Sequence, residues 1–190
     1  MTRGPWVISK TSKPFGNDAQ MFDSSFGWRF VNPKMQKMYG TDAMGVTAEN
    51  LAEMYNISRE DQDLFALRSQ QKATAAQQNG IFAEEIIPVE MTDRKGNVTV
   101  FAKDEFIKPN TTLEGLAKLK PAFKKEGGTV TAGNASGLND GAAAMFIASE
   151  EAVKSYNLSP KARIVSSAVV GVEPRIMGIG PVGASQKALQ

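Results

Sequence analysis

The chain has 190 residues, a formal net charge of +2, 42% hydrophobic and 22% charged residues, and neither cysteine nor histidine. These values are those of an ordinary soluble globular protein, and the charge is too small to indicate binding to nucleic acid or to an acidic membrane. Without cysteine or histidine the chain has no disulfide framework, no thiolate nucleophile, no cysteine-ligated zinc and no Ser-His-Asp or Cys-His arrangement.

The length allows one domain or parts of two. The apolar runs are far shorter than the about 20 residues that a membrane-spanning helix needs. Met1–Trp6 lacks the apolar core of a signal peptide. We therefore expect a cytoplasmic protein with neither a membrane nor a nucleic-acid partner.

Residues 1–40 contain scattered prolines, glycines and aromatic residues without a clean period. This pattern predicts loops with one or two short helices, for example residues 33–39, where Pro33 suits a first helical turn. Residues 47–55 are predicted to form the next helix, with Thr47 as its N-cap.

The clearest helical pattern covers residues 59–79. Ser58 and Asp61 fit a capping box, apolar residues follow with helical spacing, and Gly80 suits the left-handed position after the helix. The glutamines of this helix are interpreted as a solvated face rather than a site; they are residues 62, 70, 71, 77 and 78.

Two short apolar and β-branched runs, residues 86–91 and 98–101, are separated by the polar segment 93–97, which predicts a hairpin. Pro88 indicates an edge position for the first strand. Thr111 or Thr112 is then expected to cap a short helix that ends at Leu116 or Lys118.

The most unusual stretch is residues 128–144, GTVTAGNASGLNDGAAA, which has one large side chain, Leu138. Glycines permit close approach of the backbone to another group and positive φ angles in turns. The apolar run at residues 142–148 has the length of a buried strand. A polar loop at the end of a core strand is where α/β sheets bind ligands.

The remaining residues predict a βαβ-like order. Ser149 begins a helix that runs to about Asn157, residues 162–170 form a strand, and residues 171–183 form a second glycine-rich loop before a helix capped by Ser185. This order favours a layered α/β scaffold.

Four motifs, which occur in the chain in the same order as in the family, resemble the thiolases, the 3-ketoacyl-CoA acyltransferases. They are GNASGLNDGAAA (133–144), AMGVTAEN (43–50), SREDQDLFALRSQQ (58–71) and PRIMGIGP (174–181). GWRFVNP (27–33) looks most like the β-ketoadipyl-CoA and other degradative branches. The resemblance implies a thiolase-like layered α/β fold. Within it, residues 1–137 correspond to the coenzyme A-binding loop region, 138–160 to the end of the N-terminal domain, and 161–190 to the start of the C-terminal domain.

Thiolases use a cysteine nucleophile, a histidine that activates it and a second cysteine as acid and base. None of these can belong to this chain, so the resemblance implies the middle of a thiolase, inactive alone, with the missing groups in segments outside it. Two alternatives remain open, a non-catalytic coenzyme A-binding module and an oligomerisation piece, because thiolases are dimers or tetramers. The implied ligands are coenzyme A and acyl-CoA as substrates, without a tightly bound cofactor.

The resemblance also implies a set of binding residues. Ser136 would bond the pantetheine arm, which Ala132 and Gly133 line, and Lys108 stands where the family often carries an arginine near the nucleotide. Phe123 matches a position near the adenine, and Met44 and Met177 lie in acyl-pocket segments. Each also has an ordinary interpretation: a turn serine, a solvated lysine, a core aromatic residue or a core methionine. Ala43 replaces a histidine typical of short-chain biosynthetic thiolases, which leaves room for a bulkier acyl group.

Overall fold

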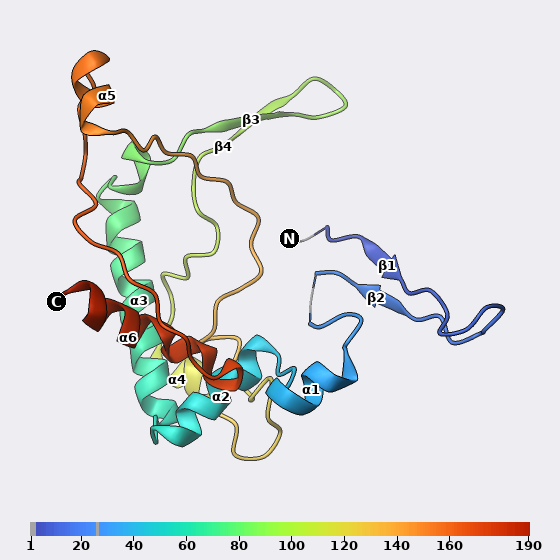
Figure 1. The fold of residues 1–190 in the computed structure, drawn as a ribbon. Coiled ribbons are helices and arrows are strands. Elements are labelled where there is room, and N and C mark those ends of the chain that lie inside the picture. The colour runs from blue at the N-terminus through green and yellow to red at the C-terminus, as the bar shows by residue number, and fades with distance from the viewer. Residues whose placement is uncertain (1–2, 26) are drawn as a thin grey trace. The chain divides into compact units, whose positions relative to one another are not determined.

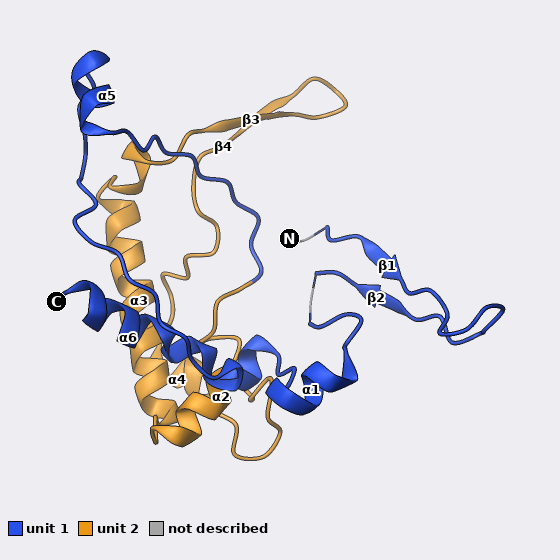
Figure 2. Cartoon of the chain, in the orientation of Figure 1, with its two compact units in different colours: residues 1–47, 138–190 blue, residues 48–137 orange. Residues whose placement is uncertain are grey.

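The computed structural model describes residues 3–25 and 27–190 (Figure 1). The chain divides into two compact units, shown in Figure 2. Unit 1 comprises Met1–Thr47 and Leu138–Gln190, and unit 2 comprises Ala48–Gly137. The assignment of residues 1–137, 138–160 and 161–190 to family domains stays a prediction. No helix in the described part of the chain is long and apolar enough to cross a membrane.

Helix α2 (Met44–Met54) begins three residues before the predicted start. Thr47 is therefore not its N-cap: the residue is buried inside the first turns, and its hydroxyl donates to the Met44 carbonyl oxygen at 2.7 Å. A threonine inside a helix can satisfy its hydroxyl by bonding a carbonyl oxygen of the preceding turn. The presence of a threonine therefore did not locate the start of α2.

Helix α3 (Arg59–Gln78) confirms the predicted long helix to within one residue. The Ser58 hydroxyl accepts the Asp61 N–H at 3.0 Å and donates to the Asp61 carboxylate at 2.9 Å, which is a reciprocal cap at the first turn. Gly80 has a φ of 77°, as expected for the residue that turns the chain away from a helix, and a short 3₁₀ turn (η1, Phe82–Glu84) follows.

We expect Ser58→Ala to lower the free energy of unfolding by about 1 kcal/mol, because the Asp61 N–H loses its acceptor. Urea denaturation followed by far-ultraviolet circular dichroism measures the change. The control is Ser69→Ala, a position in the interior of α3 that caps nothing. An unchanged midpoint for Ser58→Ala would contradict the capping role.

The predicted hairpin is present as antiparallel strands β3 (Val89–Thr92) and β4 (Val98–Phe101), with Val89 opposite Phe101. The first strand starts after Pro88, because proline has no N–H to give to a ladder. In the turn, the Asn97 side chain and the Asn97 and Lys95 backbone N–H groups donate to Asp93 and lower the pKa of its carboxyl group.

Helix α4 (Leu113–Ala117) resolves the choice between the two threonines. The Thr112 hydroxyl accepts the Gly115 N–H at 3.1 Å and caps the helix, whereas the Thr111 hydroxyl donates to the Lys108 carbonyl oxygen at 2.7 Å. The buried residues of unit 2 include only a few apolar side chains, among them Leu116 and Val130, together with two acids, Glu49 and Asp63. Its interior is therefore small and unusually polar.

Unit 1 starts with a hairpin that the sequence did not indicate, formed by β1 (Trp6–Ile8) and β2 (Met21–Asp23). Its strands are three residues long and its connection is long, so neither alternation nor a tight-turn signal marks it. Helix α1 (Pro33–Tyr39) confirms the predicted short helix, and the Asn32 side chain caps it by accepting the Lys34 and Met35 N–H groups.

The two strands predicted in the second half of unit 1 are not formed. Residues 142–148 and 162–170 lie outside any helix or strand and form no strand ladder with another described segment, so the βαβ-like order is wrong for this structure. Phe146 and Val165 are 103% and 89% exposed. A strand needs a neighbour for its backbone hydrogen bonds, and an apolar run without one does not form a sheet.

The helices of this region are also shorter or shifted. Helix α5 (Glu150–Ser155) is capped by Ser149 as predicted but ends before Asn157. The predicted loop 171–183 contains a 3₁₀ helix (η2, Pro174–Ile179) and the start of α6 (Gly180–Ala188). Ser185 therefore lies inside α6 rather than at its cap. Pro181 in the first turn, where its missing N–H costs nothing, explains the earlier start.

Candidate functional site

Unit 2 contains a small open hollow of about 130 Å³ beside the glycine-rich loop. Its wall brings together Lys108, Ala132 and Gly133, three of the predicted binding residues, with side chains from α3 and α4. The full lining is Gln70, Phe106, Lys108, Thr111, Leu116, Ala132, Gly133 and Ala135. Amide, hydroxyl, ammonium and aromatic groups thus line the hollow together with the small residues Ala132, Gly133 and Ala135, which suits a narrow ligand with polar atoms.

Two glutamines of α3 hydrogen-bond the backbone of residues 104–108, the segment that carries Lys108 and Phe106. The Gln70 amide oxygen accepts the Lys108 N–H at 2.8 Å, and the Gln77 amide donates to the Asp104 carbonyl oxygen at 3.2 Å. The interpretation of the α3 glutamines as a purely solvated face is therefore wrong. Gln70 and Gln77 lie on the same side of the helix because they are seven residues, or two turns, apart.

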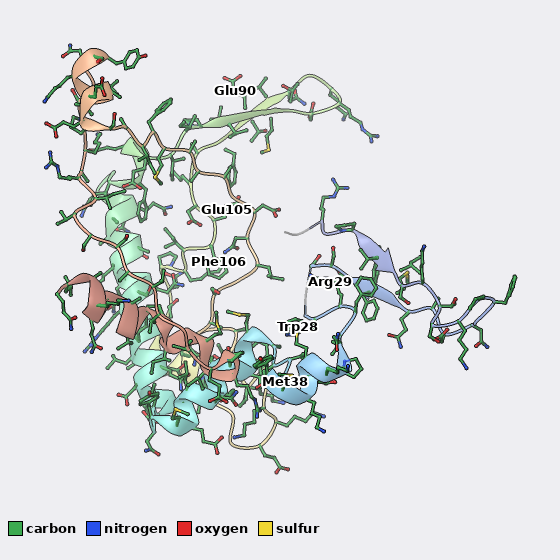
Figure 3. The ribbon with its side chains drawn as sticks, in the orientation of Figure 1. Trp28, Arg29, Met38, Glu90, Glu105 and Phe106 are labelled. Atoms are coloured by element: carbon green, nitrogen blue, oxygen red, sulfur yellow. The ribbon has the colours of Figure 1, made fainter. Side chains whose placement is uncertain are left out.

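The glycines of the loop allow close packing against side chains. A Cβ at Gly133 would lie 2.5 Å from both Leu116 Cδ2 and Leu119 Cδ1, and one at Gly137 would lie 2.5 Å from the Phe106 ring. Phe106 lies on the long connection between β4 and α4 (Figure 3). The predicted close approach is confirmed, and the groups approached are these three apolar side chains.

A buried carboxylate from α2 holds the start of the loop. Glu49 is 5% exposed and accepts four hydrogen bonds from one dipeptide 80 residues along the chain. The Thr129 N–H lies 3.0 and 2.9 Å from its two oxygens, the Thr129 hydroxyl 2.9 Å and the Val130 N–H 2.8 Å. The carboxylate thus accepts from two successive backbone N–H groups and from one threonine hydroxyl, which fixes the start of the loop.

A second buried carboxylate, from α3, holds the middle of the loop. Asp63 is 3% exposed; one oxygen accepts the Asn134 amide at 3.0 Å and the other accepts Arg59 Nε at 2.8 Å. The Asn134 amide also bonds Thr129 O at 3.0 Å and the Thr131 N–H at 2.8 Å. Arg59 Nη2 in turn donates to the Leu116 and Leu119 carbonyl oxygens at the end of α4.

Ser136 and Phe123 lie in the same unit but do not line the hollow. Ser136 is exposed, Phe123 is half-buried, and their roles stay predictions. Lys108 is exposed, with its ammonium 5.8 Å from the centre of the Phe106 ring, a cation–π contact that holds the charge at the rim.

Met44 and Met177, the other two predicted residues, belong to unit 1 and are 69% and 44% exposed. The segments that carry them are joined by an ion pair between Asp42 and Arg175 Nε at 2.9 Å. The hydrogen bond to Asp42 and its charge raise the pKa of Arg175. Trp28, labelled in Figure 3, donates from Nε1 to the Asp42 carbonyl oxygen at 3.2 Å. The residue just before the AMGVTAEN motif is therefore paired with the PRIMGIGP motif.

Sequence reasoning missed Glu49, Asp63 and Gln70. Glu49 lies inside the AMGVTAEN motif and Gln70 inside the SREDQDLFALRSQQ motif, so the motifs contained both without marking their roles. Asp63 follows Arg59 at helical i,i+4 spacing, but that spacing usually indicates a surface ion pair rather than a buried one.

Comparisons with known proteins agree with this structure. The model of the thiolase N-terminal domain family matches residues 17–151. A beta-ketoadipyl-CoA thiolase of Escherichia coli is 55% identical over all 190 residues, which are 47% of that protein. A probable acetyl-CoA acyltransferase of Staphylococcus aureus is 58% identical over 191 residues, again 47% of its length.

Solved structures show the same relationship. The Bacillus anthracis acetyl-CoA acetyltransferase superposes with a TM-score of 0.81 and 43% identity, over 96% of this chain and 45% of that one. The human mitochondrial 3-ketoacyl-CoA thiolase superposes with a TM-score of 0.82 and 44% identity, over 98% and 45%. The chain belongs to the thiolase family and has an α/β thiolase-like fold. It spans about half the length of the relatives that it matches.

Proposed function

We propose that this chain supplies the coenzyme A-binding part of a thiolase, an acyl-CoA C-acyltransferase. The observation that carries the proposal is the hollow of unit 2, where Lys108 meets the loop residues Ala132 and Gly133. In the complete enzyme a cysteine outside this chain attacks the C3 carbonyl of a 3-ketoacyl-CoA, the C2–C3 bond breaks with release of acetyl-CoA, and the cysteine passes the acyl group to coenzyme A; condensation is the reverse. Coenzyme A and acyl-CoA are substrates, and no cofactor is held tightly.

The ligand and the hollow match in chemistry. The pantetheine arm carries amides on a narrow chain, which fits a hollow lined by Ala132, Gly133 and Ala135. Ser136 follows these residues in the chain, and we propose that its hydroxyl bonds one of the amides. Coenzyme A phosphates need cations, and Lys108 offers one at the rim, as a point charge rather than the fork of an arginine. Phe123, Met44 and Met177 complete the proposed contacts, at the adenine and acyl ends.

The named relatives support a further part of the proposal. Several of them are beta-ketoadipyl-CoA thiolases, which favours a 3-ketoacyl-CoA from aromatic degradation as the substrate of the parent enzyme. We also propose that the parent is cytoplasmic and assembles as a homo-oligomer, a dimer or tetramer. The absence of cysteine and histidine favours one second candidate, a non-catalytic coenzyme A-binding module.

Calorimetric titration with coenzyme A at two ionic strengths tests the proposed site. We expect weak binding, weakened by about 1 kcal/mol in Ser136→Ala through the loss of one neutral hydrogen bond. Lys108→Ala should weaken binding mainly at low salt, because ions screen a phosphate contact near the surface. The two effects should add, since the positions contact opposite ends of the ligand.

The matched control is Lys95→Ala, which removes an exposed lysine in the turn between β3 and β4. It should leave the affinity unchanged at both salt concentrations. If coenzyme A binds and neither Ser136→Ala nor Lys108→Ala alters its affinity, the ligand lies elsewhere and the assignment of these residues is wrong.

A further inference from the structure

The loop that forms the proposed groove has little of its own to hold it in one shape. Residues 128–137 include three glycines and two alanines, which contribute small packing areas, and the glycines lose more conformational entropy on ordering than other residues do. A groove made of this backbone must be fixed by groups from elsewhere, because a ligand that ordered the loop itself would bind less tightly.

Those groups are two buried acids on different helices. Glu49 of α2 binds the backbone at Thr129 and Val130, immediately before the groove residues. Asp63 of α3 binds Asn134, which lies between Gly133 and Ser136. The loop is thus tied down before and within the groove.

Asp63 also sets the opposite wall. It orients Arg59, which donates at 2.6 and 3.1 Å to the Leu116 and Leu119 carbonyl oxygens of the α4 end. The side chains of Leu116 and Leu119 pack against Gly133, and Leu116 lines the hollow. One carboxylate therefore fixes the distance between the glycine loop and α4.

The backbone at Lys108, which forms the rim of the hollow, is held by a residue other than the two acids. That residue is Gln70, and neither carboxylate bonds the segment 104–108. Phe106 packs against Gly137 of the loop and lies under the Lys108 ammonium, so the loop and the rim touch through one ring. Because Gln70 holds the Lys108 backbone, disturbing the acids should alter the groove for the ligand's arm much more than the cationic rim.

We propose that Glu49 and Asp63 are positioning residues that preorganise the glycine loop for the pantetheine arm of coenzyme A. This inference rests on the proposed function. It predicts that their loss weakens binding of the arm and not of the nucleotide, a selectivity that a merely structural role would not produce.

The test uses the 190-residue chain and two probes, pantetheine for the arm and adenosine 3′,5′-bisphosphate for the nucleotide, titrated by nuclear magnetic resonance. Glu49→Gln replaces one acceptor oxygen by a donor that faces the Thr129 N–H, and Asp63→Asn does the same toward Asn134 or Arg59. Each should lower pantetheine affinity about tenfold, as expected for hydrogen bonds to a charged group. Each should leave the affinity for adenosine 3′,5′-bisphosphate within about twofold.

The chain offers matched controls on the same helices. Glu53 of α2 forms an exposed ion pair with Lys124, and Glu60 of α3 is exposed. Glu53→Gln and Glu60→Gln should change neither affinity. Thr129→Val removes one hydrogen bond to Glu49 while keeping the side-chain shape, so it tests the same tie if Glu49→Gln fails to fold. It should weaken pantetheine binding about threefold.

Equal losses for both probes in a folded variant, or no loss for pantetheine, would overturn the inference. Failure of the wild-type chain to bind either probe would instead contradict the proposed function. It would also contradict the proposal that Glu49 and Asp63 shape the loop for the pantetheine arm. Amide hydrogen exchange separates the two failures: faster exchange at residues 129–137 in Glu49→Gln and Asp63→Asn shows that the acids order the loop even if the ligand is wrong.

Discussion

Gly128→Ala is expected to lower the free energy of unfolding by about 3 kcal/mol, the upper part of the range for overpacked sites. A Cβ at this position would meet the Lys124 carbonyl oxygen and lie 2.9 Å from Pro121 Cβ and 3.1 Å from Glu49 Oε1. The backbone cannot move aside easily, because the next residue, Thr129, is held by the Glu49 carboxylate on both its N–H and its hydroxyl.

Gly141→Ala is the control for this change. Gly141 belongs to the same glycine-rich stretch, but an added Cβ there would meet nothing within 4 Å. Its unfolding midpoint in urea should equal that of the wild type or exceed it slightly, since alanine lowers the entropy of the unfolded chain. Equal midpoints for Gly128→Ala and Gly141→Ala would show that the contact with the Lys124 carbonyl relaxes at no cost.

The helices were predictable because their signals are local. Ser58 and Ser149 each accept an N–H three residues away, so residue type and short spacing sufficed to place these two caps. Thr112 was predicted only as one of two neighbouring threonines, and the Asn32 cap was not predicted. Where two local signals compete, the prediction failed: Thr47 bonds back into its own helix, and Pro181 starts α6 before Ser185 is reached.

The strands depended on information that is not local. Residues 142–148 have the composition of a buried strand, but a strand exists only where a second segment meets its hydrogen-bonding edge. In the described chain no such segment is present, and Met145, Phe146 and Ile147 are exposed. Composition thus identified a segment suited to burial without supplying the partner that buries it.

The candidate site divides in the same way. The glycine-rich loop was predictable as a place of close backbone approach, because small residues have few other uses in such a run. The acids that hold it were not, since Glu49 and Thr129 are 80 residues apart and Asp63 and Asn134 are 71 apart. One sequence alone does not predict which carboxylate hydrogen-bonds which loop when the two are this far apart in the chain.

The largest expected effect concerns catalysis: the 190-residue chain alone should show no thiolysis of acetoacetyl-CoA and no acetyl exchange. Acyl transfer in this family needs a thiolate to accept the acyl group, and the chain has no cysteine to form one and no histidine to activate it. The binding residues proposed for it would orient a substrate, and orientation without a nucleophile does not break the C2–C3 bond of a 3-ketoacyl-CoA.

Iodoacetamide makes this expectation testable even with trace contamination. The reagent alkylates the nucleophilic cysteine of an intact thiolase, whereas the present chain offers it no thiol, so the intact mass of the chain should not change on treatment. Any residual thiolysis that the reagent abolishes belongs to a contaminating enzyme, and a full-length thiolase treated in parallel is the positive control. Thiolysis that survives the reagent and rises in proportion to the concentration of the chain would contradict the expectation. It would assign the chemistry to an oxygen or nitrogen nucleophile within these 190 residues.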